Sequence, residues 1–516
     1  APLLVSKAKK VYIVLEDGTE NVLTDSASYS LGEDDSNTDG AIFSKADLTI
    51  NGSGTLTVNA NYKHGIVSKD DLVITDGNIN VTSASTAMEG KDSVKISGGK
   101  FDISAGTNGI KSTNTETSDK GFISVTGGSF TVVANNDAFE AETVLSIEGG
   151  SFDITTGGGS ANASMKSDGT PNSDWQNNMG NGGGGPNGMG RPDDNGNGTG
   201  GEPPAMPTAD STGLTIETAA ANTTTDSTDT TDNTSTSAKA LKAGNEVNIS
   251  GGEFKIDSAD DSVHSNGNIV ITGGNISVAS GDDGMHANGN LTISDGTVDI
   301  TKSYEGIEGS IVTIDGGTIS VVASDDGINC AGGSDTGSTD RMGADQFSSQ
   351  DGVELNINGG TITIDAEGDG LDSNGNFTMA GGTVYVCGPT NGGNGALDYN
   401  GTATVTGGTL IACGAVGMEE GFGDNSTQYS VLHDLGSTVS ANKKLTITDS
   451  DGKEILSFTP TKTWQSVVFT SADLKNGETY TITAGSQSET VTIDGIVTSN
   501  SKGMSFGRGH GGGRGF

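Results

Sequence analysis

The 516-residue sequence is poor in arginine, cysteine and long apolar runs, and each shortage excludes a class of protein. With four arginines and a net charge of −41, the chain would be repelled by nucleic acids and anionic membranes. Three cysteines provide neither a disulfide framework nor the paired spacing of a zinc site. No apolar run reaches the roughly 18 residues that a membrane-spanning helix requires. We therefore expect neither a disulfide-stapled domain nor a membrane-inserted protein.

Apolar residues make up only 31% of the chain, whereas glycine is abundant at 83 residues. A conventional globule of this length would need more apolar side chains to offset its conformational entropy. A solenoid needs fewer, because each coil buries only a small ring of side chains. Sparse cysteine, many small polar residues and a first residue that is Ala rather than Met favour an exported, extracellular protein.

The sequence repeats with a period of about 22 residues. The strings DDSVHSNGNIVITGGNISVAS and DDGMHANGNLTISDGTVDITK start at Asp260 and Asp282, and an apolar anchor follows each acidic turn. Extending this frame predicts about fourteen coils. Their anchors are Ile42, Ile66, Met88, Ile110, Phe139, Met165, Leu241, Val263, Met285, Ile307, Ile328, Leu371, Leu397 and Met418.

Each coil has two alternating stretches on either side of a glycine corner. Residues 268–272 and 275–278 alternate apolar and polar side chains, which is typical of strands, and Gly273–Gly274 supplies the tight turn between them. A perimeter of roughly 70 Å, at about 3.3 Å per residue, suits a three-sided coil. Propeller blades are longer, and sandwiches do not repeat one turn motif in register. The sequence therefore predicts an all-β fold, a right-handed parallel β-helix.

The coils are predicted to occupy residues 1–165 and 238–435. Between them, residues 166–237 are rich in Gly, Asn, Ser and Thr, and we expect a surface excursion that leaves the coil frame intact. Residues 441–494 alternate again and are expected to form a small β-sandwich-like module. Residues 495–516 form a Gly/Arg-rich tail.

Acidic residues occupy the corner before the anchor in successive coils. Stacked coils would place these carboxylates about 5 Å apart, and like charges that close destabilise a fold unless a cation bridges them. Calcium takes oxygen ligands of this kind, although Asp-Gly is also a common solvated turn. The predicted ligands of several Ca²⁺ ions are Asp260, Asp261, Asp282, Asp283, Glu305, Asp325, Asp326 and Asp369.

Two histidines and two tyrosines are weaker candidates for contact with a carbohydrate. His264 and His286 follow the anchors of neighbouring coils, so we expect them to stack on the outer face beside Glu308. Imidazole and carboxylate could bind a transition metal, but two exposed histidines without a third fixed partner are the simpler alternative. Tyr304 lies in an acidic corner, and Tyr385 should point outward from a strand.

Three further sets of residues are expected to be structural. The phenylalanines that follow the glycine corners should face the core at Phe101, Phe130, Phe152 and Phe254. Asparagine ladders, with amides bonded between coils, are expected at Asn266 and Asn268, Asn288 and Asn290, and Asn374 and Asn376. Cys387 and Cys413 should stack as free thiols.

Parallel β-helices include pectate lyases and polygalacturonases, so a polysaccharide lyase is an alternative function. A lyase needs a basic residue beside the calcium-bound uronate to take the proton. The later coils contain few basic residues, and we expect none of them to lie in the acidic corners. These basic residues are Lys239, Lys242, Lys255, Lys302 and Arg341. A Gly-His-Gly motif, which related hydrolases use, occurs only at residues 509–511. The sequence therefore predicts a protein that is not an enzyme.

Four segments resemble bacterial secreted carbohydrate-binding-domain proteins. They are EDGTENVLTD at residues 16–25, AIFSKADLTINGSGTLTV at 41–58, HGIVSKDDLVITDGNINV at 64–81 and SFTPTKTWQSVVFTSADLKNGETYTIT at 457–483. The resemblance implies a calcium-containing right-handed β-helix, similar in shape to pectate lyases, that binds cellulose or an acidic polysaccharide at the cell surface without cleaving it. It identifies no binding residues beyond the acidic corners.

Members of this family usually carry further coil-like strands before the EDGTEN segment, whereas this chain opens directly with coil-like sequence. An uncapped β-helix end exposes unpaired backbone and can act as a template for strand addition. The alternative function is therefore a subunit that stacks end to end with itself as an extracellular fibre or adhesin.

Overall fold

A computed structural model describes residues 1–30, 38–163, 237–331 and 349–501. The chain divides into one compact unit, residues 1–164 and 236–516, and a second unit, residues 165–235, which lies outside the described residues. The predicted excursion, apart from Thr236 and Ser237, belongs to that second unit. No helix in the described part of the chain is long and apolar enough to cross a membrane.

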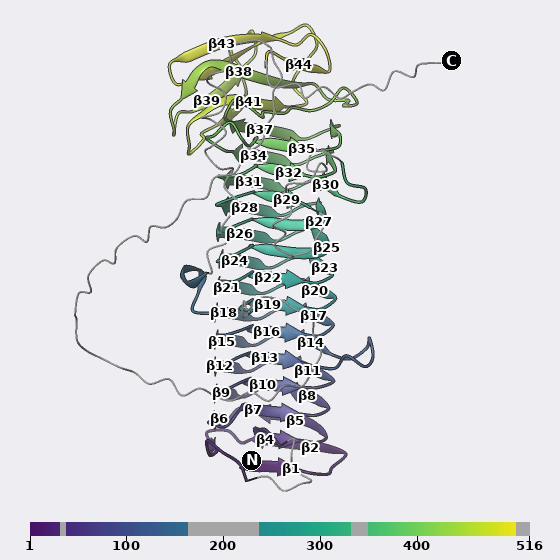
Figure 1. Cartoon of the computed structure of the whole chain (residues 1–516), viewed down its shortest axis with the longest axis vertical. Coiled ribbons are helices and arrows are strands. Elements are labelled where there is room, and N and C mark those ends of the chain that lie inside the picture. The colour runs from purple at the N-terminus through teal and green to yellow at the C-terminus, as the bar shows by residue number, and fades with distance from the viewer. Residues whose placement is uncertain (31–37, 164–236, 332–348, 502–516) are drawn as a thin grey trace, which may run out of the picture. The chain divides into compact units, whose positions relative to one another are not determined.

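The described coils form a parallel β-helix, as the sequence predicts, and each turn has three strands, one more than the two alternating stretches predicted (Figure 1). The first strand of each coil carries the anchor: β1 (Leu3–Val5), β4 (Gly40–Ser44), β7 (His64–Ser68), β10 (Met88–Gly90), β13 (Ile110–Ser112), β16 (Phe139–Ala141), β19 (Leu241–Ala243), β22 (Val263–Ser265), β29 (Ile328–Cys330), β32 (Leu371–Ser373) and β35 (Leu397–Tyr399).

The second strand of each coil precedes the glycine corner: β2 (Lys10–Leu15), β5 (Asp47–Gly52), β8 (Asp71–Ile74), β11 (Ser93–Ile96), β14 (Phe122–Val125), β17 (Val144–Ile147), β20 (Glu246–Ile249), β23 (Asn268–Ile271), β30 (Glu354–Ile357), β33 (Asn376–Met379) and β36 (Ala403–Val405). In two coils the first and second strands are continuous, as β25 (Met285–Ile293) and β27 (Ile307–Ile314).

The third strand follows the glycine corner and belongs to a separate sheet: β3 (Glu20–Thr24), β6 (Thr55–Ala60), β9 (Asn78–Ser83), β12 (Lys100–Ala105), β15 (Ser129–Ala134), β18 (Ser151–Thr156), β21 (Glu253–Ser258), β24 (Asn275–Ser280), β26 (Thr297–Lys302), β28 (Thr318–Ala323), β31 (Thr361–Ala366), β34 (Thr383–Cys387) and β37 (Thr409–Gly414). A short 3₁₀ helix, η2, spans Ser160–Asn162.

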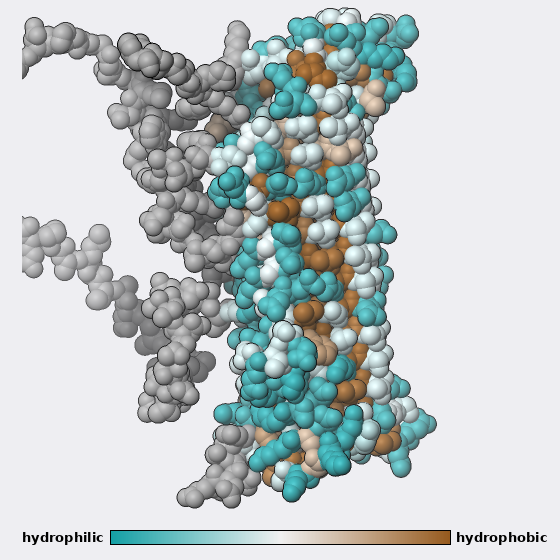
Figure 2. Space-filling model, turned by 90° about the vertical axis from the view of Figure 1, so that its right-hand side faces the viewer, coloured by the Kyte–Doolittle hydropathy of each residue, from teal (hydrophilic) through white to brown (hydrophobic). Residues whose placement is uncertain are grey.

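The alternation of apolar and polar residues determines which side chains are buried. Along β21, every second residue is buried and the residues between are exposed. Gly274 turns the chain with φ of 99°, a conformation that residues with a Cβ rarely adopt. On the outside, the face drawn in Figure 2 is mostly hydrophilic on either side of a line of apolar side chains.

The anchors pair in register, but the ladder differs from the predicted one at three positions. Phe139 pairs directly with Leu241, so no rung lies between them, and the predicted anchor Met165 lies outside the described residues. Met418 lies outside any strand, whereas Leu3 pairs with Ile42 and is a rung that the frame missed. The described residues therefore contain thirteen rungs rather than fourteen. The coil frame continues across residues 164–236, as expected.

Four phenylalanines stack inside the coils, as predicted. Phe101, Phe130, Phe152 and Phe254 form a continuous pile with ring centroids 4.6, 4.8 and 4.5 Å apart and nearly parallel planes. Phe152 and Phe254 belong to coils on either side of residues 164–236, so the pile spans that interruption. The cysteines Cys330, Cys387 and Cys413 are free and buried, and Cys387 lies opposite Cys413, as expected.

Replacing Phe152 with Ala should lower the free energy of unfolding by about 3–5 kcal/mol, because it removes a fully buried ring between two stacked neighbours. Val133→Ala is the control, since Val133 is 49% exposed and should change stability by less than about 0.5 kcal/mol. Denaturant unfolding measures both. Equal effects of the two substitutions would contradict the assigned core.

The C-terminal strands form a module larger than residues 441–494. It comprises β38 (Ser430–Val439), β39 (Leu445–Thr448), β40 (Glu454–Phe458), β41 (Trp464–Thr470), β42 (Thr479–Ala484), β43 (Gln487–Thr492) and β44 (Val497–Ser499). Strand β41 pairs antiparallel with β37, so the sheet formed by the third strands of the coils continues into the module. Because β44 pairs with β38, the tail starts later than the predicted residue 495.

Candidate functional site

The residues that lie two positions before each anchor stack along one edge of the coils. We call this stack of residues the corner column. In each coil the backbone N–H after the corner donates to the corner carbonyl of the next coil, as from Gly284 N to Glu305 O at 3.0 Å. The described members of this column that carry charge are Asp137, Lys239, Asp261, Asp283, Glu305, Asp326 and Asp369.

A second column, the flanking column, consists of the residue directly after each anchor. Register pairs its members in order along the coils: Glu140, Lys242, His264, His286, Glu308, Asn329, Asp372 and Asp398. The two columns lie side by side in every coil, three residues apart in sequence. Five of the predicted ligands therefore belong to the corner column and both histidines to the flanking column, whereas Asp260, Asp282 and Asp325 each directly precede a corner residue.

The corner carboxylates connect successive coils. Asp261 Oδ1 accepts from the backbone N–H of Asp283 at 3.1 Å, and Asp326 Oδ1 accepts from that of Asp369 at 2.6 Å. Asp369 Oδ1 accepts in turn from Gly395 N at 2.5 Å. One oxygen of each of these carboxylates thus accepts a hydrogen bond from the backbone of the next coil. A simple solvated turn would not require such a bond.

The first coils of the edge contain their own cations. Lys239 Nζ lies 2.8 Å from Asp260 and 2.9 Å from Asp261, and Lys242 lies 3.3 Å from Asp137. The expectation that no lysine falls in the acidic corners is therefore wrong. Lys239 is itself a corner residue, and the low-complexity segment before it replaces the acidic turn that marks the other corners.

Lys239 also determines the protonation of its neighbour. Burial alone would raise the pKa of Asp261, but Lys239 and the hydrogen bond from His264 hold it well below its usual range. Asp282 brings a carboxylate oxygen within 4.8 Å of ligand atoms of Asp260 and Asp261. Since Lys239 already pairs with two of these three carboxylates, this corner is the less favourable place for a metal.

The two histidines are buried rather than exposed, which corrects the prediction for them. Their rings stack with centroids 5.1 Å apart, as expected, but His264 is 4% exposed and His286 only 1%. Burial opposes a charge on His286, yet its hydrogen bonds to Asp283 and Glu308 and the nearby carboxylates outweigh burial and raise its pKa to about 12. Neither ring is available for direct contact with a sugar.

The asparagine corners serve several purposes rather than one ladder. Asn266 and Asn288 accept from the histidine rings at 2.9 Å each. Asn268 Oδ1 accepts from the backbone N–H of Asn290, and only Asn374 bonds amide to amide, with Asn400. The expected bonding of amides between coils is therefore found at Asn268, Asn374 and Asn376, whereas Asn266 and Asn288 bond the histidine of their own coil.

Beyond Glu308 the edge has no protein cation among the described residues. We call Asp325, Asp326, Asp369, Asp372 and Asp398 the acidic edge, and all five are half-buried. In the described ranges of the chain, no lysine, arginine or histidine pairs with any of them. The predicted ligands Asp325, Asp326 and Asp369 thus lie in a stretch where the charged groups around Asp326 are other carboxylates, Glu305 among them.

Burial and mutual repulsion raise the pKa values along the acidic edge. Burial raises the pKa of Asp369 to about 7, with Asp398 and Asp325 adding to the shift. Burial and the charge of Asp369 raise the pKa of both Asp326 and Asp372 well above the usual range. Without a cation, these groups therefore bind protons more readily than ordinary aspartates do.

Asn329 supplies a further oxygen at this place. It lies between Glu308 and Asp372 in the flanking column, and its Nδ2 donates to Glu305 at 2.9 Å. Its buried Oδ1 has no donor within hydrogen-bonding distance among the described residues. A buried carbonyl oxygen without a donor is costly, so a cation among these carboxylates would satisfy it.

The predicted tyrosines lie away from one another. Tyr304 is a half-buried corner residue whose backbone joins Asp282 and Asp325. Tyr385 points outward from β34, but Phe458 of the C-terminal module stacks on it at 5.4 Å. A shallow hollow of about 290 Å³ lies there, lined by Thr363, Tyr385, Lys444, Ser457, Phe458 and Thr459. Carbohydrate contact at either tyrosine stays a prediction.

Sequence reasoning missed Asp372, Asp398 and Asn329 as members of the site. Each follows an anchor that the frame had already identified, at Leu371, Leu397 and Ile328. A column at this position, which already contained both histidines, was therefore readable from the spacing. The spacing could not show that Asn329 Oδ1 has no donor among the described residues, because this depends on side-chain geometry.

Replacing Lys239 with Met should lower the free energy of unfolding at neutral pH by about 3–5 kcal/mol, because it leaves the buried Asp261 without its main partner. The matched control is Lys255→Met, whose ion pair with Asp153 is exposed and should contribute almost nothing. Denaturant unfolding of both variants tests this. A Lys239 variant as stable as the control would contradict the buried pairing.

Comparisons with known proteins point to one family. Residues 1–284 and 285–395 match the family described as carbohydrate-binding domain-containing protein. A protein of that description from Acetivibrio thermocellus is 49% identical over 82 residues, which cover 16% of this chain and 29% of that protein. The chain thus spans less than a third of this relative.

A solved structure is also similar in sequence over part of its length. It is described as the polysaccharide lyase-like protein from C. thermocellum, in a gadolinium derivative. The identity is 43% with a TM-score of 0.30, over 31% of this chain and 64% of that one.

Proposed function

Because the chain belongs to the family of carbohydrate-binding domain-containing proteins, we propose that it binds an acidic polysaccharide through calcium held by the acidic edge. The observation that supports this most strongly is the stack of cation-free carboxylates beside Asn329 Oδ1. Carbohydrate binding agrees with the family's description, whereas the polysaccharide, its acidity, the calcium and the place of binding are the proposal.

The donor set fits calcium. Asp326, Asp369 and Asp372 offer carboxylate oxygens, and Asn329 offers an amide oxygen; calcium takes about six to eight such oxygens in flexible geometry. The hydrogen bonds to Asp326 and Asp369 use only one oxygen of each carboxylate. When bound, calcium would supply the positive charge that this part of the chain lacks.

Calcium would also explain how an acidic protein can bind an acidic ligand. A net charge of −41 repels a polyuronate unless cations intervene. The residues of the acidic edge are half-buried rather than fully buried, so a bound ion could keep coordination positions open for a sugar carboxylate. The role of this chain's residues is to hold and orient the ion.

We propose binding without cleavage. A lyase needs a base near the calcium-bound uronate, and Lys239, the lysine that occupies a corner position, is buried in ion pairs. Its neighbours Asp261 and Asp260 outweigh burial and hold its pKa well above the usual range. A lysine that keeps its proton this firmly is unsuited to abstract one.

An extracellular location at the cell surface is part of the same proposal, because sites of this kind in extracellular modules bind calcium at about 0.1–1 mM. End-to-end assembly stays a separate prediction.

Polygalacturonate should retain the protein from solution when calcium is present and lose it when EDTA is added, because the ion bridges two sets of carboxylates. Capture on insoluble beads, with cellulose beads in parallel, measures this. Retention that is unchanged by EDTA would contradict calcium bridging, and equal retention by cellulose would contradict an acidic ligand. Release of unsaturated product during the incubation would show a lyase instead.

A further inference from the structure

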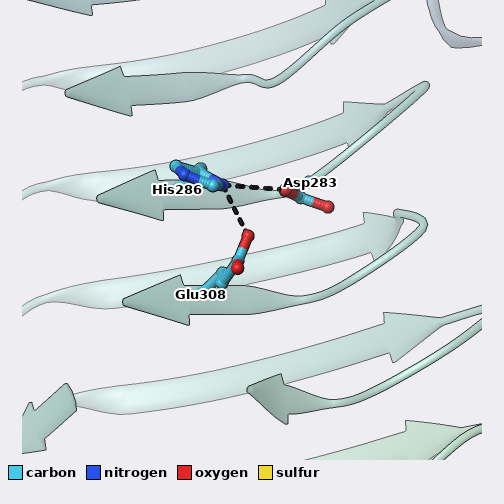
Figure 3. Close-up of side chains that lie close together, drawn as sticks. All are labelled: Asp283, His286 and Glu308. Atoms are coloured by element: carbon cyan, nitrogen blue, oxygen red, sulfur yellow. Dashed lines mark hydrogen bonds and ion pairs between the residues drawn. The ribbon is translucent and has the colours of Figure 1, made fainter. Parts of the chain in front are cut away.

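A second kind of ligand set lies earlier along the same edge. His286 Nδ1, on β25, lies 3.1 Å from Asp283 in the preceding corner and 2.5 Å from Glu308 on β27 (Figure 3). These three side chains each offer one ligand atom, and all three atoms lie within 4.8 Å of one another. The carboxylates therefore converge on one ring nitrogen from two coils.

The other ring nitrogen fixes the orientation of the imidazole. His286 Nε2 lies 2.9 Å from Asn288 Oδ1, which can only accept a hydrogen bond, so Nε2 carries a proton. In the neutral ring, the lone pair of Nδ1 would then point toward Asp283 and Glu308. A hydrogen bond from the other ring nitrogen to a fixed acceptor is typical of metal-binding histidines.

The neighbouring coil provides an internal comparison. His264 repeats the arrangement, with Nδ1 2.8 Å from Asp261 and Nε2 2.9 Å from Asn266. There, however, Lys239 supplies a positive charge to Asp261 at 2.9 Å. Among the described residues, no lysine or arginine supplies a corresponding positive charge to Asp283 or Glu308.

We propose that His286, Asp283 and Glu308 bind a divalent transition metal of the Zn²⁺ class. One nitrogen and two carboxylate oxygens match the three protein ligands of an open zinc site, with a fourth position for water or an incoming group. An imidazole ligand favours such metals over calcium, which prefers oxygen. Glu308 is 15% exposed at its side chain and gives access from the surface. This site does not depend on the proposed calcium edge.

The test uses the full chain without an affinity tag, freed of metal with EDTA and dialysed into excess calcium so that the oxygen sites are filled. Titration with Co²⁺ should produce visible absorption bands of a bound ion, and Zn²⁺ should displace it. Glu308→Gln and His286→Gln should each weaken binding at least about tenfold, since each removes a ligand. The matched control, His264→Gln, should retain wild-type affinity.

Wild-type protein that binds no Co²⁺, or that binds it as tightly after Glu308→Gln as before, would overturn the proposal. Either result would mean that His286 is an imidazolium ion paired with two carboxylates. If His286→Gln unfolds, Glu308→Gln decides the question, because Glu308 lies partly at the surface and its replacement removes one ligand without emptying the buried ring position.

Discussion

Calcium-free protein is expected to be more stable at pH 5 than at pH 8, and calcium is expected to reduce this difference. The reason is the acidic edge, where burial raises the pKa of Asp369 to about 7, against about 3.9 for an aspartate in an unfolded chain. A group whose pKa is raised by folding stabilises the protein fully at pH values below its unfolded pKa. It loses that contribution as pH rises through the folded pKa.

The expected size of this effect is large. For Asp369 alone, a pKa difference of this kind corresponds to roughly 4 kcal/mol lost between about pH 4 and pH 8. Asp326 and Asp372 shift in the same direction. Asp261 shifts in the opposite direction, but its pKa lies so low that it stays charged from pH 5 to pH 8.

Calcium requires the charged carboxylates, so it should stabilise the protein most at pH 8. At a free concentration 100 times its dissociation constant, one bound ion adds roughly 2.7 kcal/mol. Thermal unfolding at pH 5, 6, 7 and 8 measures how the midpoint depends on pH, once with EDTA and once with calcium. A calcium-free protein whose midpoint rises from pH 5 to pH 8 would contradict the assignment of a cation-free edge.

Replacing both Asp369 and Asp372 with Asn is expected to stabilise the calcium-free protein at pH 8 and to abolish calcium-dependent capture on polygalacturonate. The substitution removes two mutually repelling charges, while the Asn oxygen at position 369 can still accept from Gly395 N–H. The gain in the free energy of unfolding should approach the loss that the calcium-free wild type shows between pH 5 and pH 8. Denaturant unfolding and bead capture measure the two effects on the same variant.

The same substitution at another corner should have the opposite sign. Asp261→Asn removes a buried charge that pairs with Lys239 and His264, so it should cost about 3–5 kcal/mol. Asp295→Asn, at an exposed position outside both columns, controls for net charge and should leave capture unchanged. If the double variant destabilised the calcium-free protein as Asp261→Asn does, the acidic edge would be an ordinary structural feature.

The repeat could be predicted because each coil marks its own register. An apolar anchor after an acidic turn and a glycine corner before the next strand recur at about 22 residues, and stacking then places equivalent residues side by side. The frame failed where these marks are weak. Leu3 has no acidic turn before it in the sequence, and Met418 follows a glycine-rich stretch that resembles a corner without pairing as one.

The chemistry of the edge could be predicted only in part. Spacing identified the corner carboxylates and stacked the two histidines, because both follow from register. It could not indicate that the rings are buried, since the side chains of two adjacent columns cover each other. Nor could it place Phe458 over Tyr385, because the contact joins a coil to the C-terminal module, whose packing no repeat determines.

A crystal structure of the protein grown with calcium tests the central claim most directly, through the anomalous difference density of the ion. The account predicts a calcium peak among Asp326, Asp369 and Asp372 at coordination distance from their carboxylates, with Asn329 Oδ1 as a further ligand. Density for water alone at this place, or calcium only at the corner where Lys239 pairs with Asp260 and Asp261, would contradict it.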